Sequence, residues 1–200
     1  NVRQVDFSYL DQAARDAGLL LSGLTVPMAL AALPGGWLAS RFGYRLPTAL
    51  GLSLAVAGFL IMGLTWTGYT PYPQMAFHLA ISGLGLGLTF SPISAAAVNT
   101  APEGERGSVS ALVIIIRLVG MTVSMSSLTT YALRRVTVLT AQATGSPTFD
   151  FSAATGVVFE ITVQVIRELM LFGGVVCLVA LVPALLMVGR SGTVSQPAGD

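Results

Sequence analysis

The chain alternates between long apolar blocks and short polar stretches. Five blocks almost free of charged side chains cover residues 17–39, 46–67, 75–98, 107–133 and 169–188. A helix that crosses the ~30 Å hydrocarbon core of a bilayer needs about 20 apolar residues. Because lipid offers the backbone no hydrogen-bond partner, such blocks must be helices rather than open strands. The pattern predicts an all-α, polytopic transmembrane helix bundle with five spans.

The connections between the blocks differ in length. Those at 40–45, 68–74 and 99–106 are short, which predicts that sequential helices are antiparallel neighbours. The fourth, 134–168, is predicted to be a long outer loop. Within it, residues 157–167 alternate apolar and polar positions, which is a strand period but equally fits an extension of the last helix, and we favour the helix. We expect 1–16 to be a polar extramembrane segment and 189–200 a disordered tail.

Proline and small residues fall inside the blocks. Proline is tolerated within membrane helices because neighbouring groups satisfy the freed carbonyl. Gly83 and Gly87 have the small-xxx-small spacing that lets two helices approach closely. We interpret these glycines as packing positions, with a gating hinge as the alternative.

Composition supports the membrane assignment and excludes several functions. The 200 residues are 54% hydrophobic and 10% charged, whereas a soluble domain carries roughly 25% charged residues. The net charge of +1 provides no basic patch for nucleic acid. One histidine and one cysteine cannot form a metal cluster or a bis-histidine haem site, so we expect no cofactor and no metal. No catalytic motif is present, and an enzyme is therefore not expected.

The turn at 40–45 carries Arg41 and Arg45 beside Gly43. Arginines here can interact with the end of the preceding helix and pair with carboxylates of a neighbouring bundle. The alternative is ordinary anchoring by positive charge, which would weakly favour placing this turn on the cytoplasmic side.

Arg117 is the most informative single residue. It lies about 15 Å along a helix from Gly107, near the middle of its span. A central arginine costs roughly 2.5–3.5 kcal/mol on insertion scales, so it should face protein or water. Helical spacing puts it on one face with Gly120, Ser124, Ser127 and Tyr131, opposite an apolar face. We predict that this face lines an aqueous cavity; the alternative is an arginine that caps carbonyl groups within the bundle.

Two observations concern groups that could bind or release a proton inside the membrane. His78 begins a polar stripe and is a possible proton carrier, although an interfacial histidine near a span end needs no special role. No aspartate or glutamate lies in the interior of a predicted span, with Asp16 and Glu168 at the edges. We therefore expect that these residues alone do not carry out proton-driven transport.

Several runs resemble the major facilitator superfamily, and in particular its fourteen-helix drug:proton antiporter branch. The turn is similar to the family signature Gly-x-x-x-Asp-Arg-x-Gly-Arg-Arg, with matching positions at Gly36, Ser40, Arg41, Gly43 and Arg45. Three further runs are similar to that branch: Leu19-Leu20-Leu21 with Pro27, residues 83–92, and residues 102–111 followed by Arg117 and Gly120. Ser40 departs from the family aspartate, and Leu46 stands where a second arginine is frequent.

The resemblance covers about 18–188 and implies most of a C-terminal six-helix half. It implies a multi-pass transporter of the bacterial inner membrane that exports small amphipathic compounds by alternating access, coupled to protons through an absent N-terminal half. The signature residues would form an inner gate. The expected partners are the lipid bilayer, a small-molecule substrate, and that missing half or a larger membrane complex. Because the chain starts at Asn1, we expect a fragment; a non-transporting membrane scaffold is the alternative.

Overall fold

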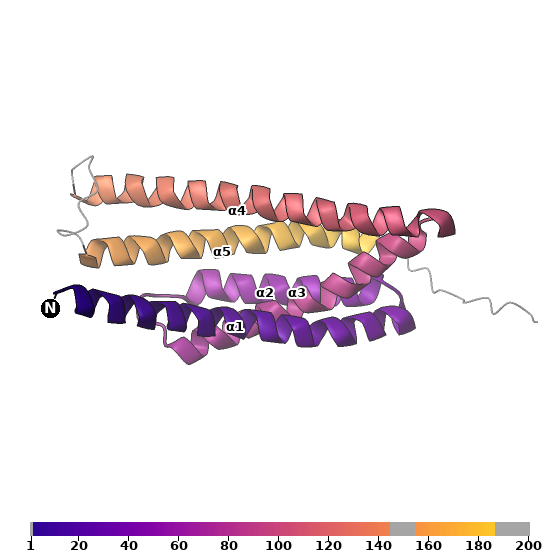
Figure 1. The fold of residues 1–200 in the computed structure, drawn as a ribbon, viewed down its shortest axis with the longest axis horizontal. Helices are drawn as coiled ribbons and strands as arrows, with labels where there is room; N and C mark the ends of the chain where they lie inside the picture. Colours follow the sequence, from indigo (N-terminus) through magenta and orange to yellow (C-terminus); the bar gives the residue numbers. More distant parts are fainter. Residues whose placement is uncertain (1, 145–154, 187–200) are drawn as a thin grey trace, which may run out of the picture.

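The computed structural model describes residues 2–144 and 155–186, and these residues form a bundle of long helices (Figure 1). The helices are α1 (Val2–Phe42), α2 (Arg45–Thr65), α3 (Tyr72–Thr100), α4 (Arg106–Thr144) and α5 (Thr155–Leu186), with a short 3₁₀ turn η1 (Glu103–Glu105) before α4. By length and composition, all five long helices can cross a membrane. No strand occurs in the described ranges, and the predicted all-α transmembrane bundle is confirmed.

The helices pack in a different order from their order in the sequence. α1 packs mainly on α3, α3 on α2, α2 on α5, and α5 on α4. In Figure 1, α1 and α4 lie at opposite edges of the bundle. The short turn between α1 and α2 therefore does not make them the closest neighbours. We call the side with the α1–α2 turn the Gly43 end and the side with the α2–α3 turn the Trp66 end.

Small residues form the contacts around α3. A side-chain carbon on Gly83 or Gly87 would overlap the carbonyl oxygen of Leu24 or Met28 in α1. On the other side of α3, a side-chain carbon on Gly85 would lie 2.6 Å from the carbonyl oxygen of Gly51 in α2. Such close contact between backbones provides van der Waals attraction where lipid removes the hydrophobic driving force. The predicted packing role of Gly83 and Gly87 is thus what the structure shows.

The two helix turns have clear local causes. Gly43 has φ of +79°, a left-handed conformation that other residues adopt at a cost, and it ends α1. At the Trp66 end, the Thr67 amide donates to Thr70 Oγ1 over 2.8 Å and closes the turn before α3.

Helices α4 and α5 are longer than their apolar blocks. The sequence predicts a loop over 134–168, but α4 continues to Thr144 and α5 begins at Thr155. Helix therefore occupies much of this connection, and the helical interpretation of 157–167 is confirmed. That the connection lies outside the membrane stays a prediction. Residues 2–16 also continue into α1 as helix. The predicted disordered tail at 189–200 lies outside the described residues.

The outer helices expose much apolar surface. The most apolar 18-residue stretch of α4 contains no buried residue. In α2 and in α3, 39% of the residues in the most apolar stretch are buried. Large side chains such as Leu33, Met125 and Leu186 are each 75% exposed. So much exposed apolar surface is expected of helices that face lipid or a further part of a membrane protein.

Candidate functional site

At the Gly43 end, the residues of the signature-like turn make mostly local contacts. Gly36 packs against Ser91 of α3, and the Ser40 hydroxyl donates to the Trp37 carbonyl over 2.8 Å. The Arg41 guanidinium lies 5.2 Å from the centre of the Trp37 ring. Neither Arg41 nor Arg45 forms an ion pair within the described residues. Both guanidinium groups therefore remain available to partners outside this bundle.

A contact that the sequence did not reveal fastens the same turn to α3. The Asn99 side-chain amide donates to the Tyr44 hydroxyl over 2.6 Å. The Thr48 hydroxyl, which is nearly fully buried, donates to the Tyr44 carbonyl over 2.7 Å. The Asn99 bond holds the turn against the last residues of α3, and no sequence pattern connects residues so far apart. The Thr48 bond is local and stabilises the start of α2.

Arg117, near the middle of the predicted span in α4, contacts α3. Its Nη2 donates to Ser94 Oγ over 2.9 Å, and its Cζ lies 4.0 Å from the centre of the Phe90 ring. A planar guanidinium suits this combination of a stacked ring and a directed hydrogen bond. The side chain is half-buried, so part of the charge stays accessible.

The other predicted cavity residues extend along α4 and do not cluster around Arg117. Gly120, Ser124 and Ser127 are exposed, and among the described residues no atom outside the local helix lies within 4 Å of a side-chain carbon placed on Gly120. Tyr131 is also exposed but reaches α5. The structure therefore places a polar, open face on α4 without closing it into a cavity within the described residues.

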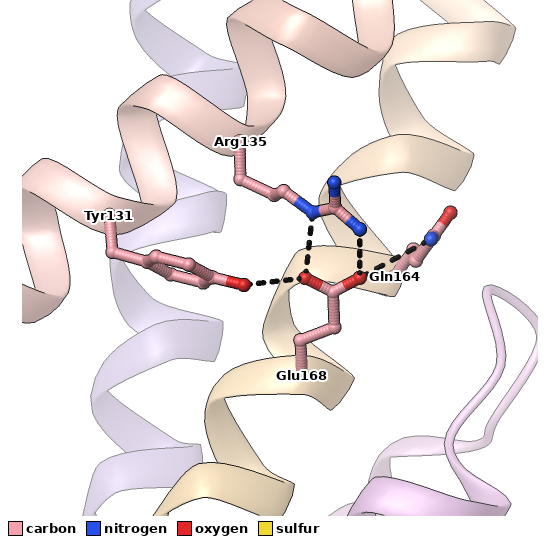
Figure 2. Close-up of polar contacts among 4 residues, drawn as sticks. All are labelled: Tyr131, Arg135, Gln164 and Glu168. Atoms are coloured by element: carbon pink, nitrogen blue, oxygen red, sulfur yellow. Dashed lines mark hydrogen bonds and ion pairs between the residues drawn. The ribbon is translucent and has the colours of Figure 1, made fainter.

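Tyr131, Arg135, Gln164 and Glu168 form a polar clamp between α4 and α5 (Figure 2). Arg135 Nε and Nη2 donate to the two Glu168 carboxylate oxygens, each over 3.0 Å. The Tyr131 hydroxyl and the Gln164 amide donate to the same carboxylate over 3.1 and 3.4 Å. Such a two-point arginine–carboxylate pair fixes orientation as well as distance.

The clamp shows that Glu168 lies within a helix. α5 begins at Thr155, before the apolar block, so Glu168 is inside α5 and not at its start. That no aspartate or glutamate lies in the interior of a membrane span, with Glu168 at an edge, stays a prediction. Sequence reasoning missed the pair because it assigned both Arg135 and Glu168 to a loop.

His78 is buried within the bundle, at 8% exposure. The Trp66 indole donates to His78 Nδ1 over 3.1 Å. Since an indole N–H can only donate, His78 Nδ1 is the acceptor of this bond, which joins the α2–α3 turn to α3.

We expect the clamp to hold α4 and α5 together at the Trp66 end. Replacing Glu168 with Ala removes the acceptor of three donors, so α4 should move more freely relative to α5. Electron paramagnetic resonance distances between labels at exposed Leu133 and Phe172, in a Cys177→Ala background, should broaden. The matched control is Glu160→Ala on the same helix, whose carboxylate binds no described residue. An unchanged distribution in Glu168→Ala would contradict this role.

Together, the bundle of glycine-packed, proline-containing apolar helices, the signature-like turn and the mid-span arginine define a polytopic membrane protein. The sequence model for the Major Facilitator Superfamily matches residues 7–199. The chain belongs to this family.

Several curated relatives carry the same kind of name. A protein of Mycolicibacterium smegmatis named triacylglyceride transporter is 30% identical over 95% of this chain and 37% of its own length. One from Mycobacteroides abscessus is 34% identical over 68% of this chain and 28% of its own length. One from Mycobacterium tuberculosis is 28% identical over 94% of this chain and 39% of its own length. The chain thus spans less than half the length of these relatives.

Proposed function

We propose that the protein moves a lipid-like, amphipathic compound across the plasma membrane of a bacterium by alternating access. The observation that carries this proposal is the open polar face of α4, which contains Arg117, Ser124 and Ser127. A polar face at mid-membrane needs water, cargo or another protein surface beside it. Binding near the midplane, between two halves, is the general arrangement in such transporters.

Two lines of similarity support the choice of cargo. The motif resemblance to fourteen-helix drug:proton antiporters favours export of small amphipathic molecules. The names of the mycobacterial relatives favour a neutral lipid and also support a bacterial membrane. A long apolar molecule with a small polar region fits both, since α4 combines large exposed apolar side chains with a narrow polar stripe.

We also propose that proton coupling depends on an acid other than Glu168. Both oxygens of that carboxylate are engaged by Arg135, and Tyr131 and Gln164 add further hydrogen bonds. A carboxylate with such partners is held in its charged form and makes a poor proton carrier. Arg41 and Arg45, which lack ion pairs here, are proposed to bind acidic groups of the facing half at the gate.

The test is a flux assay on the complete gene product that contains this chain, reconstituted into liposomes. With a proton gradient imposed, we expect a labelled triacylglyceride to move across the membrane at a rate above that of protein-free liposomes. A small hydrophilic sugar is the matched negative cargo. Collapse of the gradient with an ionophore should reduce lipid movement.

Failure has distinct meanings in this assay. If neither a labelled triacylglyceride nor amphipathic dyes move, transport is wrong and a membrane scaffold becomes the better interpretation. If dyes move and the lipid does not, the cargo assignment is wrong. If movement continues unchanged without the gradient, the proton coupling is wrong.

A further inference from the structure

A cleft of about 1420 Å³ opens at the Trp66 end, between the α2–α3 turn and the first turns of α5. The turn joins two apolar helices that are each long enough to span a bilayer, so it must lie at a membrane surface. Trp66 and the highly exposed Tyr69 line the cleft from this turn, and such residues are enriched at the membrane–water interface. The cleft therefore opens at the depth of lipid headgroups.

Two charges in the cleft lack partners of opposite charge. Arg167 donates its Nε to the Gly63 carbonyl over 2.9 Å, which leaves its two terminal nitrogens uncommitted. The Glu160 carboxylate binds no described residue. The two side chains lie two turns apart on one face of α5, about 10 Å along its axis, and no ion pair joins them. Glu168 also lines the cleft, but Arg135 neutralises it.

The rest of the cleft is suited to acyl chains. Phe159 and Leu171 contribute apolar walls, and the Phe159 ring meets the turn at Gly68, where an added side-chain carbon would lie 2.6 Å from that ring. The volume exceeds that of pockets for drug-sized ligands, which are about 300–1,000 Å³. The cleft thus combines one available cation, one available anion and an apolar wall.

We propose that this cleft binds the headgroup of a zwitterionic phospholipid from the surrounding membrane, with the phosphate at Arg167 and the amine at Glu160. A guanidinium matches the geometry of a phosphate, and a carboxylate or an aromatic face attracts an ammonium group. An anionic headgroup would be repelled by Glu160. A neutral headgroup would make no ion pair with either charge. The site binds a resident lipid of the membrane and does not depend on the cargo proposed above.

Photocrosslinking tests the site on the complete gene product that contains this chain, in lipid nanodiscs. Three probes with identical photoreactive acyl chains carry phosphatidylethanolamine, phosphatidylglycerol or diacylglycerol headgroups, and labelled peptides are mapped by mass spectrometry. We expect the phosphatidylethanolamine probe to label residues 159–171 about tenfold more than the diacylglycerol probe, the change that one charged contact provides.

Variants of Glu160 and Arg167 test how each charge contributes to labelling by the probes. Glu160→Gln should raise labelling by phosphatidylglycerol relative to phosphatidylethanolamine, since it removes the repulsion and breaks no protein contact. Arg167→Gln should lower labelling by both phospholipids, and Arg167→Lys should retain part of it. Glu105→Gln, an exposed acid at the Gly43 end, is the matched control and should change nothing.

Two results would overturn the proposal. One is equal labelling of 159–171 by the diacylglycerol and phosphatidylethanolamine probes, which would show that the headgroup is not recognised. The other is a phosphatidylglycerol to phosphatidylethanolamine ratio that Glu160→Gln leaves unchanged. The Glu160 result stands even if Arg167→Gln fails to fold, and neither result depends on transport.

Discussion

Gly85→Ala and Gly87→Ala should each lower the thermal midpoint of the purified protein by roughly 5–10 °C, equivalent to about 3 kcal/mol of overpacking. The reason is that both glycines face backbone and not flexible side chains. A methyl group at Gly85 would overlap the Ala55 amide nitrogen in α2, and one at Gly87 would overlap the Met28 carbonyl oxygen in α1. Backbone cannot move aside without separating whole helices.

Gly18→Ala is the matched control for this prediction. No atom outside the local helix lies within 4 Å of a side-chain carbon placed on Gly18. Alanine is a better helix former than glycine by about 1 kcal/mol, so the midpoint should stay constant or rise slightly. Differential scanning fluorimetry in detergent makes the comparison. Equal midpoints for Gly87→Ala and Gly18→Ala would show that the close packing of α1 on α3 is not required for stability.

Arg117→Gln should reduce the transport rate by about 10- to 100-fold, which corresponds to the loss of a charge-assisted hydrogen bond worth about 1.5–3 kcal/mol. The arginine is the contact through which α4 meets α3 at mid-span, via Ser94 and Phe90. Arg117→Lys keeps the charge but not the planar group that stacks on Phe90, and should retain an intermediate rate. Flux into liposomes measures the effect.

Folding must be separated from transport for the Arg117 variants. Size-exclusion profiles and thermal midpoints should match those of the unmodified protein within a few degrees. Ser126→Ala is the control on the same helix, because the Ser126 side chain lies outside the polar stripe that contains Ser124 and Ser127. A well-folded Arg117→Gln protein that transports at the normal rate would remove Arg117 from the cargo path and leave it a structural role on α3.

The sequence was sufficient to predict what depends on local pattern. The length of the apolar blocks predicted five helices, because lipid offers the backbone no hydrogen-bond partner outside the helix. The spacing of Gly83 and Gly87 indicated a close helix contact, which the structure places against α1. Proline did not end any of these helices, as Pro27, Pro34 and Pro183 show.

What the sequence could not predict depends on tertiary contacts. The bounds of α4 and α5 were missed because hydropathy counts apolar residues, whereas a helix can continue through polar ones once a neighbour packs against it. Arg135 and Glu168 stabilise such a continuation, but nothing in their spacing indicates that they meet. Sequential helices do contact one another, but the extensive contact of α1 with α3 could not be predicted from turn length, since it depends on where glycines allow backbones to approach.

The clamp between α4 and α5 has a consequence for biogenesis. Glu168 follows Arg135 by 33 residues, so at a synthesis rate of 5–20 residues per second the acid is made roughly 2–7 s after the base. During that interval Arg135 lacks the carboxylate that it binds in the folded protein. The α4–α5 contact at this end can therefore form only after α5 has been made as far as Glu168.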